Sequence, residues 1–325
     1  MPVGNSEQGV GLWGGQIMFT MDNVTNYIDW WHEPTPGEAF EHQGDLLSFI
    51  ATPTLSIGLN DYWMISITQA IGYRGMGWDM PDTSWHHRTE NTTSDFANAI
   101  GGLLGDSYLN LRYLVLNTGS MDGYRFFIGS GVVIPSKNTL TSDPFFLLEK
   151  EEDGSISWDE GNHSHRHFSI SEGTYKGIFE LQFFKKQSIN PVFYGFALKT
   201  ILPINESEYG FKPSNIYEIT FTLLTNPIKP INSSIGANLG YIHSTDAKWN
   251  GIISPNSKST FLLPGLSLIK GFSKGTVTIG IQKPIFLLGS LSGTSDGINL
   301  EQRVKAIQLS IGYRQILDLN IPFLN

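Results

Sequence analysis

Apolar and polar residues alternate along much of the chain with a period of two, which is typical of β-strands whose faces meet different surroundings. In the clearest segment one face is apolar and the other small or polar. The apolar face reads Trp63, Ile65, Ile67, Gln69, Ile71, Tyr73, and the other face Met64, Ser66, Thr68, Ala70, Gly72. Aromatic residues end the apolar face, about ten residues apart, as the interfacial girdles of a transmembrane barrel require.

Segments of this kind predict about twelve strands, each of the length that a tilted membrane span needs. Pro264 makes one of them irregular. The expected strands lie near residues 10–21, 46–58, 62–74, 106–117, 123–135, 173–184, 191–203, 214–225, 233–244, 259–271, 275–288 and 303–323.

The connections between these strands alternate between long and short. The longest lie near residues 22–45, 75–105 and 136–172. A transmembrane barrel predicts this alternation, with short periplasmic turns and long external loops. We therefore expect an all-β protein, a transmembrane antiparallel up-and-down β-barrel that forms one domain over residues 1–325. A soluble β-sandwich or barrel also alternates, but its second face is wet rather than lipid-covered.

Composition favours the membrane barrel. Only 16% of the residues are charged, against about 25% in ordinary soluble domains. Aromatic residues reach 12% and glycine occurs 35 times. No apolar run approaches the roughly 20 residues of a transmembrane helix, which excludes a helical membrane protein.

Charge and cysteine content exclude further classes. A net charge of −9 without a Lys/Arg cluster argues against nucleic acid as a partner. The absence of cysteine removes disulfides, thiolate metal sites and cysteine nucleophiles. The N-terminus shows neither the basic nor the apolar region of a signal peptide, so an exported protein would be represented here in a mature form.

Two strand-like stretches carry a resemblance to a known family. The first runs from Gly105-Asp106 through Leu109 and Leu111 to Arg112-Tyr113, and later strands end in Ile134-Pro135-Ser136 and Leu202-Pro203. These stretches resemble outer-membrane transporters of the aromatic-degradation type. The C-terminal Leu317-x-Leu319-x-Ile321-x-Phe323 resembles the assembly signal of outer-membrane proteins, although Leu324 and Asn325 follow the aromatic residue. The resemblance spans about residues 105–225 and the C-terminus, and implies an outer-membrane location and passive transport.

Charged residues on the polar faces would point into the lumen of such a barrel. They could line a hydrated pathway and set its selectivity, or pair with one another and fill a narrow barrel. Both interpretations stay open at this point. The residues are Arg112, Arg125, Lys176, Glu180, Lys199, Glu218, Arg314 and Asp318.

Histidines cluster in two of the long loops. Alternate histidines on an extended segment share one side, about 6–7 Å apart, and could hold a divalent transition metal or sit in a solvated loop incidentally. Acidic neighbours could equally attract Ca²⁺. We expect no required cofactor. The candidate ligands are His86, His87, His163, His165 and His167.

Three functional hypotheses follow. The first is a bacterial outer-membrane channel or transporter for passive passage of a small solute, hydrophobic ones included, in contact with outer-membrane lipid and lipopolysaccharide. The second is an outer-membrane lipid hydrolase with His167 as base and Ser169 as nucleophile, two positions apart on one strand face. The third is a non-conducting surface barrel whose histidine-rich loops bind a metal or a partner. We favour the first, which is not an enzyme.

Overall fold

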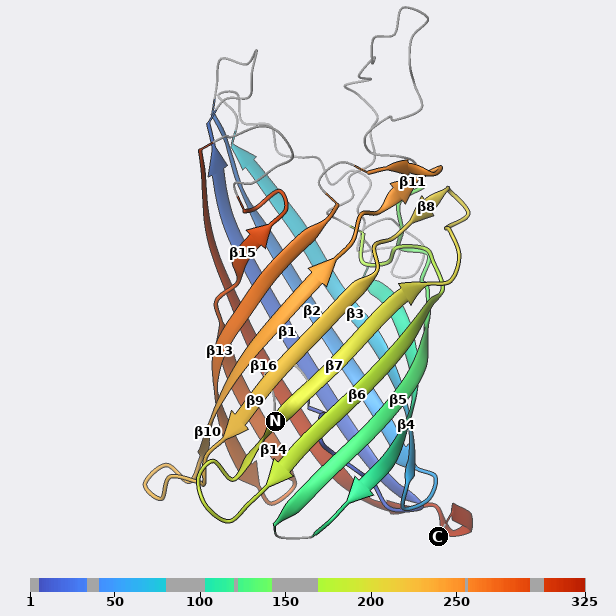
Figure 1. Ribbon diagram of the computed structural model, residues 1–325, viewed down its shortest axis with the longest axis vertical. Helices are drawn as coiled ribbons and strands as arrows, with labels where there is room; N and C mark the ends of the chain where they lie inside the picture. The colour runs from blue at the N-terminus through green and yellow to red at the C-terminus, as the bar shows by residue number, and fades with distance from the viewer. Residues whose placement is uncertain are drawn as a thin grey trace, which may run out of the picture.

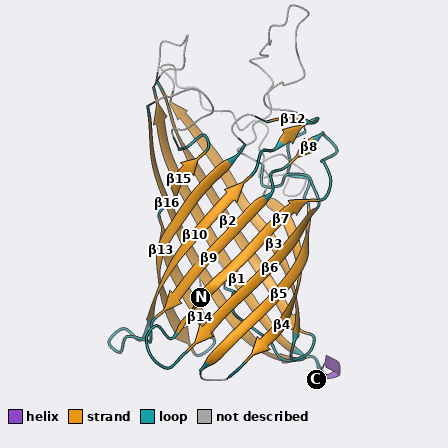
Figure 2. Ribbon diagram, viewed as in Figure 1, coloured by secondary structure: helices purple, strands orange, loops and turns teal. Residues whose placement is uncertain are grey.

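The chain folds into a closed, antiparallel, twelve-stranded barrel (Figures 1 and 2). We call each position in the ring a stave; every stave is one strand, except that β14 and β15 together form one. The computed structural model describes residues 6–33, 41–79, 103–119, 122–141, 169–254, 257–292 and 301–324. This confirms the fold class expected from the alternation. The barrel strands are β1 (Gln16–His32), β2 (His42–Gly58), β3 (Trp63–Asp79), β4 (Leu104–Asn117), β5 (Gly123–Ile134), β6 (Lys176–Lys186), β7 (Phe193–Pro203), β9 (Ile216–Leu224), β10 (Ser234–Ser244), β13 (Ser259–Phe272), β14 (Gly275–Gln282), β15 (Ile285–Leu288) and β16 (Gln302–Asn320).

Each stave pairs with its neighbours in chain order, and the ring closes where β1 meets β16. This closing ladder runs from the pair His32–Gln302 to the pair Gln16–Asn320. Closure gives most backbone groups of the ring a partner in a ladder. The exception among the described strands is β15, which pairs only with β13, so residues 302–307 of β16 pair only with β1. The turns at residues 59–62, 118–122, 187–192, 225–233 and 273–274 define the short-turn end of the barrel, and both termini lie toward that end (Figure 1).

One stave is divided, because the segment expected at residues 275–288 contains Pro284. Strand β14 pairs with β13 and β16, whereas β15 pairs with the other end of β13. Proline has no backbone N–H to donate to a ladder. Pro264, by contrast, is accommodated inside β13, and its carbonyl oxygen accepts from Lys283 N at 3.0 Å.

Two expectations about the N-terminal region were wrong. The expected strand at 10–21 begins only at Gln16, and residues 22–32 of the expected first long loop continue β1. Strand β2 likewise starts at His42, before the expected end of that loop at 45. The pairing of β1 with both β2 and β16 outweighs the polar and aromatic composition of Asn23–Trp31, which had suggested a loop.

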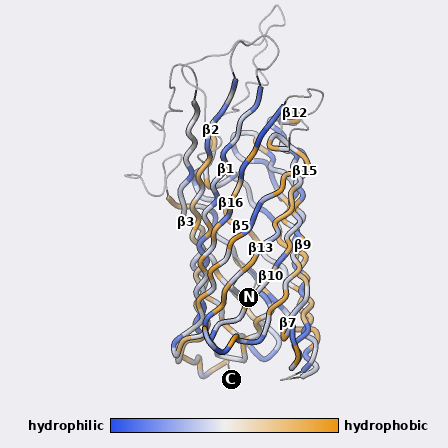
Figure 3. Tube along the Cα trace, turned by 90° about the vertical axis from the view of Figure 1, so that its left-hand side faces the viewer, coloured by the Kyte–Doolittle hydropathy of each residue, from blue (hydrophilic) through white to orange (hydrophobic). Residues whose placement is uncertain are grey.

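The two faces of the wall differ as the alternation predicts. Outward residues are large and apolar, and many are more than half exposed, as Ile67 (58%) and Phe179 (57%) illustrate. Inward residues are mostly small or polar and buried, such as Ser56, Ser66 and Gln182. Figure 3 shows the resulting alternation of hydropathy along individual strands.

Outward aromatic rings gather near the short-turn end. Trp63 packs on Tyr113 with ring centroids 4.7 Å apart, and Lys185 Nζ lies 5.5 Å from the centroid of Tyr124. Amphipathic rings and cations at one level are typical of the membrane–water interface. Further members of this aromatic belt are Tyr62, Phe183, Tyr194, Phe196 and Phe221.

A small cap lies at the opposite end. Strands β8 (Phe211–Lys212), β11 (Lys248–Trp249) and β12 (Ile252–Ile253) form a three-stranded sheet that the alternation did not predict. Its core holds Trp249, which is fully buried, against Phe211 with ring centroids 4.8 Å apart; Leu140 and Ala247 complete the cluster. Connections expected to be plain loops thus contribute packed structure above the wall (Figure 1).

Candidate functional site

The chain's own N-terminal segment lies inside the barrel. We call residues 6–15 the N-terminal plug. Ser6 and Leu12 are buried, and the plug contacts inward side chains from several staves. At its end, Gly15 N donates to Gly58 O at 2.8 Å, and the chain then turns into β1. The lumen is therefore occupied by a short segment with little regular structure.

Three arginines from three strands each donate a hydrogen bond to a carbonyl oxygen of the plug. All three bonds are longer than the roughly 2.7–2.9 Å of strong charge-assisted hydrogen bonds. The arginines therefore hold the plug at several points but not tightly at any one. The bonds run from Arg314 Nη1 to Ser6 O (3.3 Å), Arg112 Nη1 to Glu7 O (3.4 Å) and Arg125 Nη1 to Gly9 O (3.3 Å).

Shorter hydrogen bonds anchor the same segment to β1, β2 and β6. Ser6 donates from its backbone N to Asp22 Oδ2 at 2.8 Å and from its hydroxyl to Asp22 Oδ1 at 2.6 Å. Gly9 N donates to Gln182 Oε1 at 2.8 Å. The carboxylate of Glu7 accepts from the hydroxyl of Ser56. Apolar packing adds to these hydrogen bonds, because Leu12 of the plug is buried against Met18 and Met64, with Val10 beside them.

Burial raises the pKa of the Glu7 carboxyl, although Arg112 and the Ser56 hydroxyl act in the opposite direction. Glu180 and Asp22 add to the increase, because like charges disfavour ionisation. Since a released plug would expose Glu7 to water, the lumen binds the protonated form of this side chain more favourably than the ionised form.

Gly9 has a conformation and a setting that suit glycine alone. Its φ of +71° lies in the left-handed region, and a Cβ there would lie 2.9 Å from Phe193 Cζ. The plug backbone therefore runs directly against the ring pair Phe184–Phe193. This close approach fixes how deeply the plug sits against β6 and β7.

A row of alternating charges crosses the inner wall beside the plug. The strand registers place Arg112 opposite Gly129, Gly129 opposite Glu180, Glu180 opposite Lys199, and Lys199 opposite Glu218. Within this row Arg112 Nη2 lies 3.1 Å from Glu180 Oε2, and both side chains are largely buried. Four of the predicted lumen residues therefore form one continuous row across neighbouring strands.

A second charged cluster lies closer to the cap. Lys176 Nζ is 2.6 Å from Glu172 Oε2 and 3.6 Å from Asp106 Oδ2. Asp106 also accepts from the backbone N of Ser136 at 3.2 Å. The lysine is buried, so its charge is offset by two carboxylates in place of water. The cluster fastens the segment after β5 to the wall.

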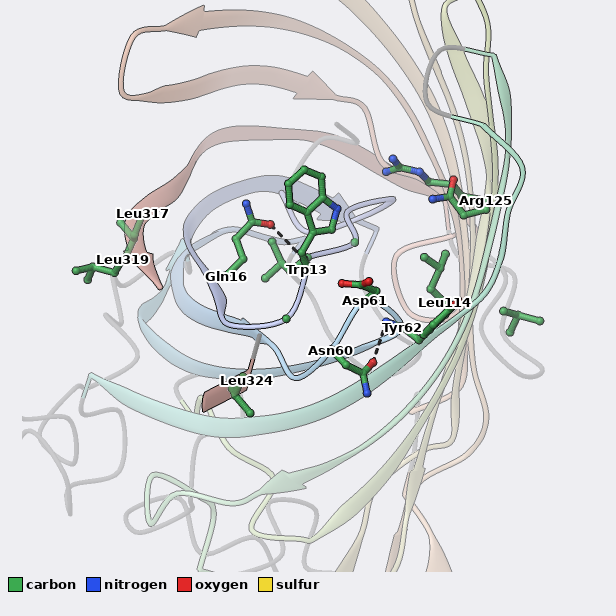
Figure 4. A pocket seen from close by; sticks show the side chains of 15 residues that line it. Trp13, Gln16, Asn60, Asp61, Tyr62, Leu114, Arg125, Leu317, Leu319 and Leu324 are labelled. Carbon is green, nitrogen blue, oxygen red and sulfur yellow. Dashed lines mark hydrogen bonds between the residues drawn. The ribbon is translucent and has the colours of Figure 1, made fainter. Parts of the chain in front are cut away.

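Two cavities flank the plug in the half of the barrel nearest the short-turn end. The larger, about 1150 Å³, opens around Trp13, Asp61 and Leu324, and Figure 4 shows the Trp13 indole pointing into it. The smaller, about 440 Å³, lies between the plug and residues of β6, β7 and β16. Arg125 and Gly11 line both, so the plug separates the two spaces.

The remaining predicted residues are only partly placed. Asp318 belongs to β16, but its side chain lies outside the described residues. His86, His87, His163, His165 and His167 also lie outside them. In the described ranges, no group of three or more His, Cys, Asp or Glu side chains is arranged to hold a metal, and no helix is long and apolar enough to cross a membrane.

Ser169 is described, and its position bears on the hydrolase hypothesis. Its side chain is 5% exposed and its hydroxyl has no hydrogen-bond partner among the described residues. Its carbonyl oxygen accepts from Arg74 Nη1 at 2.9 Å, inside the barrel end. A buried hydroxyl does not face lipid, so the location gives the hydrolase hypothesis no support. The pair with His167 stays untested.

The plug was missed by sequence reasoning, which assigned its second half to a strand. A signal was present: Gly9, Gly11, Gly14 and Gly15 fall within a few positions, and glycine weakens strand interiors. Such a density favours close backbone approach over pairing in a ladder.

A closed twelve-stranded barrel with an apolar exterior, a charged interior and residues 6–15 in the lumen has the architecture of outer-membrane barrels. No protein-family model matches the sequence, and no curated protein matches it. Among solved structures, an outer membrane channel from Pseudomonas putida F1 is similar, with 11% identity, a TM-score of 0.60, and coverage of 97% of this chain and all of that one.

Other outer-membrane barrels align over most of the chain but less closely. A homologue of FadL from Pseudomonas aeruginosa has 8% identity and a TM-score of 0.41, covering 97% of this chain and 98% of its own. The translocator domain of the autotransporter NalP from Neisseria meningitidis has 8% identity and a TM-score of 0.39, covering 95% and 90%. The Pseudomonas putida channel thus establishes the fold, which agrees with the resemblance drawn from the sequence motifs.

Proposed function

We propose that the protein spans the outer membrane of a bacterium and forms a passive channel whose lumen the N-terminal plug closes. The membrane placement is supported by the apolar outer face of the staves and by the aromatic belt at the short-turn end. Lipid would cover surfaces such as those of Ile67 and Phe179, which no other part of the described chain covers.

The observation that carries the proposal is the way in which the lumen is filled. A structural core would be apolar and closely packed. This lumen instead holds a peptide segment that combines one small apolar cluster around Leu12 with hydrogen bonds, three of them long, and it has cavities on both sides. Removal of such a segment exposes wall residues that water can solvate, such as Asp22 and Gln182, so the barrel can survive plug release.

The charges on the lumen wall indicate the polarity of the solute. A row of mixed charges across the inner wall excludes large apolar molecules from a direct path, because they would have to desolvate Arg112, Lys199 or Glu218. We therefore propose a small solute that carries some polarity. An open lumen with mixed charges would also conduct ions, which gives a direct assay.

A reversible tether tests the role of the plug. Ser6 Oγ and Asp22 Oδ1 are 2.6 Å apart, and the chain has no native cysteine. In the double variant Ser6→Cys/Asp22→Cys, oxidation should lock the plug to β1. Single-channel recordings in planar bilayers should then show closed channels when oxidised and frequent openings after reduction. Single-cysteine variants serve as matched controls, since a reductant should not change their current.

Two results would contradict the proposal. Equal currents before and after reduction of the double variant would show that the plug does not close the pathway. Failure of the refolded protein to insert into bilayers, combined with solubility in plain buffer, would remove the membrane placement itself.

A further inference from the structure

The smaller cavity beside the plug has the size and walls of a ligand site. Its volume of about 440 Å³ falls within the roughly 300–1,000 Å³ of small-molecule pockets. Plug residues such as Gly9 and Val10 form one wall. Opposite them lie apolar side chains of the barrel, Phe184, Phe193 and Leu224.

Aromatic surface dominates the barrel side of this cavity. The rings of Phe184 and Phe193 stack with centroids 4.8 Å apart and planes inclined by 19°. Phe184 is almost fully buried, so the ring pair is fixed by its surroundings. A flat or slender apolar group could lie against these rings at little cost in side-chain ordering.

All the charged side chains that line this cavity are basic. Arg125, Lys186 and Arg314 line it, and no Asp or Glu does. The plug bonds of Arg125 and Arg314 end on neutral carbonyl oxygens, which do not offset the guanidinium charges. Among the described residues, no carboxylate lies within ion-pair distance of either arginine.

Asp22 is the carboxylate nearest to Arg314 along the paired strands β1 and β16, and it accepts hydrogen bonds from another residue. Arg314 pairs with Thr20 across the closing ladder, and Asp22 follows two residues later on the same inner face. Both oxygens of Asp22 accept hydrogen bonds from Ser6. The Asp22 charge nevertheless acts on Arg314, whereas no carboxylate of the described residues acts on Arg125. Arg125 is therefore the guanidinium with unused capacity for an anion.

We propose that this cavity is a binding site for a small organic anion with an apolar body, such as a monocarboxylate that carries an aromatic ring or a short alkyl chain. The carboxylate would lie against Arg125, and the apolar body against the rings of Phe184 and Phe193. As the cargo of a channel, this anion rests on the proposed function; as a ligand of the folded barrel, it does not.

Binding can be measured without transport. Titration calorimetry on the whole chain in detergent, with benzoate as the probe, should give saturable binding. Benzyl alcohol, which has the same ring without the charge, should bind at least about tenfold more weakly, because it makes no charge-assisted hydrogen bond. Arg125→Gln should lower benzoate affinity by about 10- to 100-fold, while Arg303→Gln, an exposed arginine at the far end of β16, should leave it unchanged.

A matched pair of variants separates the cavity charge from the attachment of the plug. Val192 lines the cavity and makes no hydrogen bond to the plug through its side chain. Val192→Glu should abolish benzoate binding, whereas Val192→Gln, of nearly the same size, should retain most of it. Equal affinities for benzoate and benzyl alcohol, or equal binding by the two Val192 variants, would overturn the inference.

Current recorded on the same preparations distinguishes this inference from the channel proposal. Benzoate binding by a barrel that never conducts would support the site and contradict the channel. Conduction by a barrel that binds benzoate no better than benzyl alcohol would support the channel and overturn the site.

Discussion

Arg112 on β4 and Glu180 on β6 form an ion pair across the intervening strand, with 3.1 Å between Nη2 and Oε2. Gly129 on β5 stands between them in the register. A Cβ at Gly129 would lie 3.3 Å from Glu180 Oε2, so the glycine leaves the space through which the side chains meet. Both partners also contact the surroundings of the plug, since Arg112 donates to Glu7 O and Glu180 accepts from Gln182.

The first prediction concerns this pair. Glu180→Gln leaves the buried Arg112 charge without its ion-pair partner, which we expect to reduce the free energy of unfolding by about 3 kcal/mol. Urea unfolding from lipid vesicles, followed by tryptophan fluorescence, measures the change. The double variant Arg112→Gln/Glu180→Gln should recover part of the loss because no charge is then left unpaired.

An exposed ion pair provides the control. Lys305 Nζ is 3.8 Å from Asp29 Oδ2, but the lysine side chain is 88% exposed. Lys305→Gln should not change the unfolding midpoint, because water already solvates both charges. A loss as large as that of Glu180→Gln would show that the assay reports charge in general and not the buried pair.

The second prediction concerns the depth of the plug. Gly9→Ala introduces a side chain at φ +71° and forces contact with Phe193, which should disfavour the inserted plug by about 1–2 kcal/mol. Open probability in bilayer recordings should rise about 5- to 30-fold. Gly251→Ala is the matched control: its φ is +83°, it has open space around it, and it lies near the cap. Gly251→Ala has the same unfavourable positive φ as Gly9→Ala, but it should not alter the current.

The third prediction concerns pH. The carboxyl of Glu7 has a raised pKa in the inserted plug, chiefly because of burial, and its ordinary value of 4.5 would return on release. Acidification therefore favours insertion. As the pH rises above 4.5 the released form loses its proton first, so the inserted plug becomes progressively less stable until the raised pKa is passed. Open probability should increase with pH over this window.

Glu7→Gln tests the assignment of that pH effect. The amide keeps the size of the side chain, cannot titrate, and can still accept from Ser56 and lie near Arg112. Its open probability should be nearly independent of pH over the same window. A wild-type pH response that persists in Glu7→Gln would assign the effect to other carboxylates that face this site, of which Asp22 and Glu180 are the first to examine.

The fourth prediction concerns the cap. Trp249→Ala removes a fully buried ring from the cluster with Phe211 and Leu140, a change that costs about 3–5 kcal/mol in protein cores. Because the cap is separate from the barrel ladder, trypsin should cleave faster after Lys248 while the barrel keeps its folded mobility on unheated gels. Ile253→Ala, at a 58% exposed position, should leave the cleavage rate unchanged.

The staves were predictable because their environment is simple. An apolar outer face and a largely polar inner face impose a period of two, and Trp63–Tyr73 records it without interruption. Errors arose where polar residues interrupt the apolar outer face. Outward Asn23 and Thr25 of β1 pair with the exposed apolar residues Ile311 and Leu309 of β16, so alternation alone could not show that the strand continues there.

The sequence predicted which charged residues face the lumen, but not which of them pair with one another. Alternation places Arg112, Glu180 and Lys199 on inward faces, whereas the register between strands decides that they form one row. Register depends on turn geometry and on ladders far apart in sequence. The plug was harder to predict than the lumen charges, because its position depends on hydrogen bonds to six strands. No local pattern in residues 6–15 indicates those bonds.

Ser6 contacts both sides of the seam where the ring closes, through Asp22 on the first strand and Arg314 on the last. A single residue near the start of the chain thus bridges strands that meet only when the whole sheet has formed. Threading the N-terminus into a completed ring and sealing the ring around it would give the same product by different routes. In the second route the peptide acts as a template, and ring closure during biogenesis becomes cooperative with N-terminal docking.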